Sequence, residues 1–328
     1  MPPTLTGANF LKYENRIKVN RHRLTRQFIY RFTERRRIVP KGAAMNSAKP
    51  IGTPMNVEDQ VAQHYTHGSL EHAILEGLTV TGKDIDNLSA SDLIPVDEFH
   101  LGWLPATAEL GKSLRIEPQM HLLDVGCGIG GPARYLAETY ECRVTGIDLT
   151  DEFVEVARAL TDRCALDDRI DFHQASALAL PFDEGSFDAA YMIHVGMNIE
   201  DKSTLFAEVW RVLKPGSRFA VYDVMRVRDG QIDYPMPWAM SEATSFVATP
   251  DEYLTVLKEH NFRIEAKNSR RDLALKLVHE MKAKAAANGP PAFGGLTIMG
   301  EKAEVRIANV FAALERGIIE PIEIVALA

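Results

Sequence analysis

The chain has 328 residues, 46% of them hydrophobic and 25% charged, which is ordinary for a globular protein. Its apolar runs fall short of the ~20 residues that a membrane-spanning helix needs, so no membrane partner is predicted. The three cysteines, Cys127, Cys142 and Cys164, have neither metal-ligand nor redox-pair spacing. We therefore expect reduced thiols, no bound metal and a cytoplasmic location.

The formal net charge is −8, but residues 1–45 are rich in arginine and lysine and poor in acids. Such a segment has three interpretations: a targeting peptide, a basic arm that touches nucleic acid or anionic lipid, or non-native sequence before a start near Met45 or Met55. We expect residues 1–50 to form a disordered arm outside the fold. The acidic remainder argues against a nucleic-acid partner, because affinity for phosphate backbones depends on clustered lysine and arginine.

Helical spacing of apolar residues extends over residues 57–78. A stretch rich in Gly, Asp and Ser follows to about Pro95 and predicts a loop. Residues 106–114 predict another helix. Residues 51–118 are therefore expected to form an N-terminal helical cap.

From residue 120 onward, short apolar strands alternate with amphipathic helices. Strands are predicted over residues 121–125, 143–148, 170–173, 187–194 and 218–224. Helices are predicted over residues 132–140, after Thr150 as cap, and after Asp201, where Leu205, Phe206, Val209, Trp210 and Leu213 face inward. Alternation of this kind predicts an α/β fold with a parallel, doubly wound sheet.

The C-terminal part is less regular. Thr249 to Glu252 form a capping box that begins a helix to about His260. A sixth strand is predicted over residues 262–266, helices over 272–287 and 301–315, and a strand with both faces covered over 318–328.

A glycine-rich loop follows the first of these strands. Gly126, Gly128 and Gly131 satisfy the G-x-G-x-x-G pattern, in which glycine lets backbone approach a ligand. This pattern is shared by nicotinamide enzymes and methyltransferases, so alone it is a weak signal. Asp124, two residues before the first glycine, suits a ligand with a positive amino group rather than a pyrophosphate. Asp148, at the end of the next strand, is placed to accept hydrogen bonds from two ribose hydroxyls.

In this order and spacing, the segments resemble the class I S-adenosylmethionine methyltransferases, especially a bacterial small-molecule branch with sarcosine/dimethylglycine N-methyltransferases and ubiquinone/tocopherol-type enzymes. The motifs that carry the resemblance are DEFH (97–100), LLDVGCGIGGPARYLA (122–137), VTGIDLT (144–150), ALALPF (177–182), HVGMNIEDK (194–202) and VLKPGSRFAVYDV (212–224). It implies a Rossmann-like, mostly parallel seven-stranded sheet with an antiparallel last strand. It also implies a methyltransferase domain over residues 119–328, with a lid insertion around 227–248.

The resemblance further implies S-adenosylmethionine as cofactor and a set of residues that bind it. These are Tyr65, Phe99, Asp124, Gly126, Gly128, Asp148, Leu149, Ser176, Ala177, Leu178 and His194. Leu149 and the Ala177 backbone would meet the adenine. Many relatives carry an acidic residue where Ser176 stands, so here a hydroxyl would make that contact. Asp148 and His194 also have plainer interpretations, as a helix cap and as a core histidine.

Methyl transfer from a sulfonium mainly requires alignment of nucleophile, methyl and sulfur, and few acid–base groups. His194 is the candidate catalytic base because the unperturbed pKa of histidine lies near neutrality. The acceptor is expected to contact residues outside the sheet core, namely His100, Trp103, Asn198, Tyr234 and Trp238. Aromatic side chains there suit either a cation–π contact to an amine or an apolar pocket for a phenol or quinone.

The prediction is therefore an S-adenosylmethionine-dependent methyltransferase that releases S-adenosylhomocysteine and acts, as a monomer or homodimer, on a small-molecule acceptor. An amine such as sarcosine or dimethylglycine is the first candidate. O- or C-methylation of a phenolic, quinone or polyketide-like acceptor is the alternative. A nicotinamide oxidoreductase and a catalytically silent cofactor-binding protein are the two competing classes.

Overall fold

The computed structural model describes residues 55–289, 291, 293–300 and 302–328. The basic arm predicted for residues 1–50 lies outside the described residues, as does Glu301, the predicted start of the last helix. Within the described ranges, no helix is both long enough and apolar enough to cross a bilayer.

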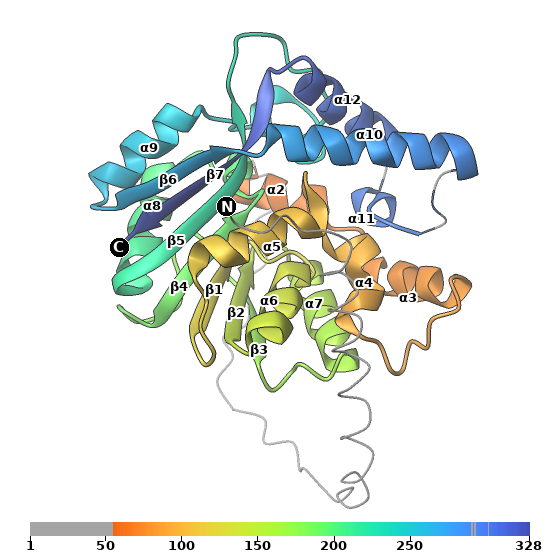
Figure 1. Ribbon diagram of the computed structural model, residues 1–328, viewed down its shortest axis with the longest axis horizontal. Helices are drawn as coiled ribbons and strands as arrows, with labels where there is room; N and C mark the ends of the chain where they lie inside the picture. The colour runs from red at the N-terminus through yellow and green to blue at the C-terminus, as the bar shows by residue number, and fades with distance from the viewer. Residues whose placement is uncertain (1–54, 290, 292, 301) are drawn as a thin grey trace, which may run out of the picture. The chain divides into compact units, whose positions relative to one another are not determined.

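Seven strands of the described chain form one sheet in the order β3-β2-β1-β4-β5-β7-β6 (Figure 1). They are β1 His121–Val125, β2 Arg143–Asp148, β3 Ile170–Gln174, β4 Phe187–Ile193, β5 Leu213–Arg226, β6 Arg263–Ser269 and β7 Ile319–Leu327. Strands β1 to β5 pair in parallel, and β7 is antiparallel to both β5 and β6. This confirms the predicted doubly wound, mostly parallel sheet with an antiparallel last strand.

Helices cover both faces of the sheet. They are α2 Val57–Tyr65, α3 Leu70–Val80, α4 Ala90–Asp97, α5 Trp103–Leu114, α6 Gly131–Tyr140, α7 Asp151–Arg163, α8 Lys202–Val212, α9 Pro250–Glu259, α10 Arg271–Asn288, α11 Leu296–Met299 and α12 Ala303–Glu315, with the 3₁₀ turns η1 Gly196–Asn198 and η2 Glu242–Thr244. On one face, Phe206 of α8 and Tyr253 of α9 pack with Met192 of β4. On the other, α5, α6 and α7 pack with Tyr191 of the same strand (Figure 1). Neighbouring residues of β4 thus serve opposite layers, because side chains alternate along a strand.

The predicted strands lie within a few residues of the observed ones, except that β5 begins at Leu213 rather than Arg218. Strand β7 is buried along both faces, as predicted. One helix prediction was wrong, because Trp210 of α8 is 42% exposed. Val209 is buried, and the next residue of a helix lies about 100° further round, which places Trp210 outside the buried stripe.

Two predictions before residue 118 need correction. The predicted helix over residues 57–78 is two helices, α2 and α3. The predicted loop that reaches Pro95 contains α4, which begins with a capping box. In this box the Asp92 carboxylate accepts the backbone N–H of Ser89 at 2.9 Å, and Leu93 in the next turn is fully buried. The polar composition of the stretch concealed this helix start.

The segment over residues 227–248 has little regular structure apart from η2. Its Met236 and Trp238 are buried in a hydrophobic cluster with Val278 of α10 and Val310 of α12. The segment therefore packs with the two C-terminal helices. The division of the chain into a cap (51–118) and a methyltransferase domain (119–328) stays a prediction.

Candidate active site

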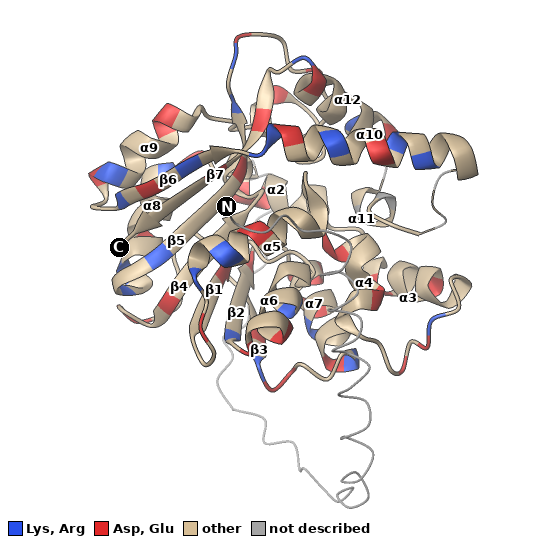
Figure 2. Ribbon diagram, viewed as in Figure 1, with Lys and Arg blue, Asp and Glu red and all other residues tan. Residues whose placement is uncertain are grey.

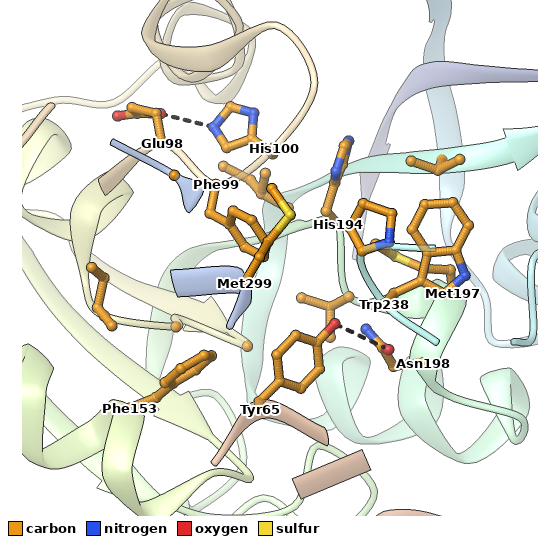
Figure 3. Close-up of a pocket in the computed structure, with 18 of the residues that line it drawn as sticks. Tyr65, Glu98, Phe99, His100, Phe153, His194, Met197, Asn198, Trp238 and Met299 are labelled. Carbon is orange, nitrogen blue, oxygen red and sulfur yellow. Dashed lines mark hydrogen bonds and ion pairs between the residues drawn. The ribbon is translucent and has the colours of Figure 1, made fainter. Parts of the chain in front are cut away.

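A cavity of about 840 Å³ lies beside the carboxyl ends of β1, β2 and β4. The loops that follow these three strands form one side of it. The other walls come from α2, the segment between α4 and α5, Trp238 and the helices α10 to α12. Ligands of doubly wound sheets bind at this edge, where the strand order reverses. Figure 3 shows part of the cavity, with side chains from several of these elements directed into it.

The glycine loop forms the wall at the end of β1. The backbone N–H groups of Gly126 and Cys127 both donate to the Ile147 carbonyl oxygen, at 2.9 and 2.8 Å. At Gly126, φ is 76° and an added Cβ would lie 2.4 Å from Val195 Cγ2. At Gly128, φ is 54° and an added Cβ would meet no atom within 4 Å. The first glycine is therefore required by packing, and the second leaves open space at the cavity wall.

Asp148 connects this loop to the start of α7. Its Oδ2 accepts the N–H of Gly128 and its Oδ1 accepts the N–H of Thr150, both at 2.9 Å. Burial raises the pKa of Asp148, and the hydrogen bonds from Thr150 and Gly128 oppose that shift. The Thr150 side chain makes no capping hydrogen bond, and Asp148 bonds to the N–H of Thr150 itself rather than to an N–H of α7. Each carboxylate oxygen has a further lone pair, so these two hydrogen bonds are compatible with ribose binding.

Asp124 is the penultimate residue of β1, and only 2% of its surface is exposed. Its Oδ2 accepts the Tyr191 hydroxyl at 2.9 Å. Burial raises the pKa of Asp124 to about 8. The Tyr191 hydrogen bond lowers it, whereas the charges of Asp148 and Glu98 raise it. A cationic amino group close to this carboxyl would favour its ionised form.

Glu98, His100 and Thr107 form a buried network on the opposite wall. Glu98 Oε2 accepts the Thr107 hydroxyl at 2.6 Å and lies 2.8 Å from His100 Nε2 (Figure 3). His100 Nδ1 lies 3.3 Å from the Leu101 carbonyl oxygen. Both ring nitrogens of His100 therefore contact protein oxygens. The residue lines the cavity with the carbon atoms of its ring. Sequence reasoning missed Glu98, although it stands inside the DEFH motif.

His194 follows β4 with φ of 54°. Its ring stacks on Tyr222 at 5.4 Å between centroids and meets the edge of His100 at 5.7 Å. The Nε2 atom is buried without a hydrogen-bond partner, and the residue lines the cavity. Burial lowers the pKa of His194 well below its ordinary value of 6.5, and His100 lowers it further. The imidazole is therefore neutral at physiological pH.

Helix α2 closes over the loop after β4. The Tyr65 hydroxyl donates to Asn198 Oδ1 at 3.3 Å (Figure 3). One residue earlier, His64 Nε2 lies 3.0 Å from the Pro237 carbonyl oxygen. These contacts join α2 to η1 and to the 227–248 segment, so the three elements together roof the cavity.

Most of the other predicted site residues also line the cavity, namely Phe99, Trp103, Leu149, Ala177, Leu178 and Trp238. Two do not. Tyr234 lies beside a separate cavity of about 460 Å³ and packs against the cluster of α10 and α12, so the structure does not bring it together with the other predicted acceptor residues. The Ser176 hydroxyl donates to Glu58 Oε1 and accepts the N–H of Leu178. Glu58 of α2 lines the cavity, so α2 brings in a carboxylate that no sequence pattern indicated.

These residues fit S-adenosylmethionine. Gly128 leaves space at the wall, Asp148 can accept from ribose hydroxyls, and the Asp124 carboxyl can face the amino group. No group of three or more His, Cys, Asp or Glu with a metal-binding arrangement is found among the described residues.

Comparisons with known proteins agree with this fit. A family model described as a methyltransferase domain matches residues 123–221. An O-methyltransferase of Pyrenophora dematioidea is 30% identical over 224 residues, 66% of this chain and 78% of the relative. An O-methyltransferase of Aspergillus sclerotiorum is 30% identical over 216 residues, 64% of this chain and 76% of the relative. The structure of geranyl diphosphate C-methyltransferase from Streptomyces coelicolor A3(2), with bound S-adenosyl-L-homocysteine, matches with a TM-score of 0.58 at 19% identity, over 84% of this chain and 98% of that one.

These matches decide between the two cofactor classes that share the glycine fingerprint. The strand order with its antiparallel β7 and the relatives agree with a sulfonium cofactor rather than a nicotinamide. The enzyme transfers methyl groups, and its cofactor is S-adenosylmethionine. The chain belongs to the class I S-adenosylmethionine-dependent methyltransferases that act on small molecules.

Proposed function

We propose that the protein transfers the methyl group to a hydroxyl oxygen of its acceptor, with His194 as the general base. The observation that carries this proposal is the buried, unpartnered Nε2 of His194 in the cavity wall. A phenol or enol must lose its proton to become a good nucleophile, whereas an unprotonated amine is already one. A neutral imidazole carries one ring nitrogen with a lone pair, which can accept this proton.

The remaining residues bind and align. Bound S-adenosylmethionine supplies a methyl group activated by its sulfonium, so the chain contributes mainly proximity and orientation. Asp148 accepts from the ribose hydroxyls, and Asp124 offers its carboxylate to the amino group. Gly126 and Gly128 let the backbone approach the methionine part.

Leu149, Ala177 and Leu178 surround the adenine, and Tyr65 and Phe99 cover the cofactor. Their positions on the cavity wall support these roles. His194 accepts the hydroxyl proton on Nε2 as the new carbon–oxygen bond forms, and this proton later passes to solvent.

The two O-methyltransferase relatives support an oxygen acceptor. Amine methylation, the first candidate from the sequence, remains the competing proposal. We favour a hydroxyl acceptor because methylation of a hydroxyl requires a base, and His194 can serve as that base in this cavity.

A product assay tests the proposal. The full chain is incubated with methyl-labelled S-adenosylmethionine and two acceptor panels, neutral mono- to tricyclic phenols and the amines glycine, sarcosine and dimethylglycine. We expect O-methyl ethers by mass spectrometry, with S-adenosylhomocysteine in equal amounts, and a loss of about 10²–10⁴-fold in kcat for His194→Asn. Methylated amines without any ether would refute the proposal. Asn tolerates the left-handed backbone at this position, so the variant separates lost chemistry from lost folding.

A further inference from the structure

The C-terminal helices build an apolar wall around the part of the cavity that faces away from the glycine loop. On α12, Ile307 and Phe311 lie one turn apart and both line the cavity. On α10, Met281 also lines the cavity, and it packs with Trp238 in one hydrophobic cluster. These helices lie together at one side of the molecule (Figure 1). An acceptor in this part of the cavity is therefore surrounded largely by hydrocarbon.

Acidic residues outnumber basic residues on the cavity wall, although Asp97 is paired with Arg134 and Asp124 is mostly protonated at pH 7. Among the described residues that line it, Lys282 is the one lysine or arginine, whereas eight are Asp or Glu. Helix α10, which carries Lys282, has basic and acidic residues along its length (Figure 2). Lys282 is already paired, because its Nζ lies 2.6 Å from Glu315 Oε1 and 5.7 Å from the centroid of the Phe311 ring.

An anionic acceptor would therefore lose its hydration without gaining a free cation. Burying a carboxylate or phosphate without a partner is strongly unfavourable, and Glu304 of α12, on the same wall, would repel it. Sarcosine and dimethylglycine are zwitterions and carry such a carboxylate. A cationic amine would first have to lose its proton before it could be methylated.

Three methionines, Met197, Met281 and Met299, also line the cavity. Methionine side chains are flexible and polarizable and adapt to apolar ligands of different shape. We therefore expect this wall to discriminate between acceptors by their charge more strongly than by their shape.

We infer that the acceptor is an uncharged, mostly apolar hydroxylated molecule, bound between the α10–α12 wall and His194, and that anionic analogues are excluded by the charge of the cavity. This inference rests on the proposed function for the hydroxyl as the methylated group, but it concerns binding and is measured without turnover.

The test uses matched pairs of probes that differ by one carboxylate. Phenol and 4-hydroxybenzoate, 2-naphthol and 6-hydroxy-2-naphthoate, and a tricyclic pair are titrated by calorimetry into the full chain saturated with S-adenosylhomocysteine. We expect at least one neutral probe to bind, and to bind tenfold or more tightly than its carboxylate partner. Equal affinity, a preference for the carboxylates, or no binding by any neutral probe overturns the inference.

A variant introduces the missing cation. Ile307→Lys should reduce the ratio of the affinity for the neutral probe to the affinity for its carboxylate partner at least fivefold. The matched polar control Ile307→Gln should weaken the binding of both probes by the same factor. Affinity for S-adenosylhomocysteine, unchanged in both variants, reports that the fold is intact. A lysine that leaves the preference unaltered contradicts the charge argument. A neutral probe that binds but is never methylated refutes the proposed function and leaves this inference standing.

Discussion

The hydroxyl of Tyr191 on β4 donates a 2.9 Å hydrogen bond to the carboxyl of Asp124 on β1. The two strands are parallel neighbours, and Asp124 is paired with Tyr191 in their register. Burial holds the pKa of Asp124 at about 8 in spite of this hydrogen bond. At pH 7 the carboxyl is therefore mostly protonated, although the amino group it would meet is cationic.

This relationship predicts a pH-dependent affinity for the cofactor. Because the ionised carboxylate is the better partner for an ammonium group, the affinity for S-adenosylhomocysteine should rise as pH increases from 6 through 8. Tyr191→Phe removes a hydrogen bond that lowers the pKa of Asp124, so the rise should move to higher pH. Asp124→Asn should weaken binding about tenfold or more and abolish the rise. Calorimetry between pH 6 and 8.5 measures all three, and an affinity of the wild type that is flat across this range contradicts the assignment.

A comparison of Gly128 with Gly185, which has a similar backbone conformation, distinguishes the effect of backbone strain from the effect of contact with the cofactor. Gly128 and Gly185 have φ of 54° and 64°, and an added Cβ would meet nothing within 4 Å at either. Gly128 lines the cavity and Gly185 does not. Each Gly→Ala variant should lose about 1–3 kcal/mol in the free energy of unfolding. Gly128→Ala should also weaken S-adenosylhomocysteine binding more than tenfold, whereas Gly185→Ala should leave it unchanged. Equal binding by the two variants would show that no ligand approaches Gly128.

A buried ion pair links α4 to α6, the helix that follows the glycine loop. Arg134 of α6 is fully buried and lies 2.5 Å from Asp97, the last residue of α4. Arg134→Met leaves Asp97 buried without a countercharge and should cost about 3–5 kcal/mol in urea unfolding. The control is Lys83→Met, which breaks the more exposed Lys83–Asp92 pair and should cost at most about 1 kcal/mol. If the two variants are equally stable, α4 is not held by this pair.

The low pKa of His194 predicts the shape of the pH profile. A base whose pKa lies well below 6.5 is already deprotonated above that pH, so kcat for a neutral phenol should not fall through titration of His194 between pH 8 and 6.5. If the catalytic histidine were exposed, kcat would instead fall to about half of its maximum near pH 6.5. A kcat that declines with an apparent pKa close to 6.5 would show that His194 is protonated more easily than its burial allows.

The parts of the site that sequence reasoning found are those fixed by local pattern. Gly126 and Gly128 follow a strand directly, and Asp148 ends the next one, so the topology alone brings them to one edge. His194 was found for the same reason, as a residue at the end of β4.

The parts that it missed depend on contacts between distant segments. Glu58 approaches Ser176 across 118 positions of the chain, and no periodicity within α2 announces that contact. Tyr234 was assigned to the acceptor because it is aromatic and near Trp238, yet Trp238 lines the cavity and Tyr234 does not. The charge of the acceptor wall could not be predicted either, because it depends on which faces of α10 and α12 turn inward.

The most direct test of the central claim is the effect of His194→Asn on a series of phenols that carry no other charged group and that decrease in pKa from about 10 to about 8. Log kcat of wild type and variant is compared for each phenol at pH 7.5. If His194 removes the hydroxyl proton, the variant should lose most activity, about 10²–10⁴-fold, on the least acidic phenols and progressively less as the phenol becomes more acidic. A loss of the same size across the whole series would contradict the account, because it would make His194 a residue that shapes the cavity rather than one that accepts the proton.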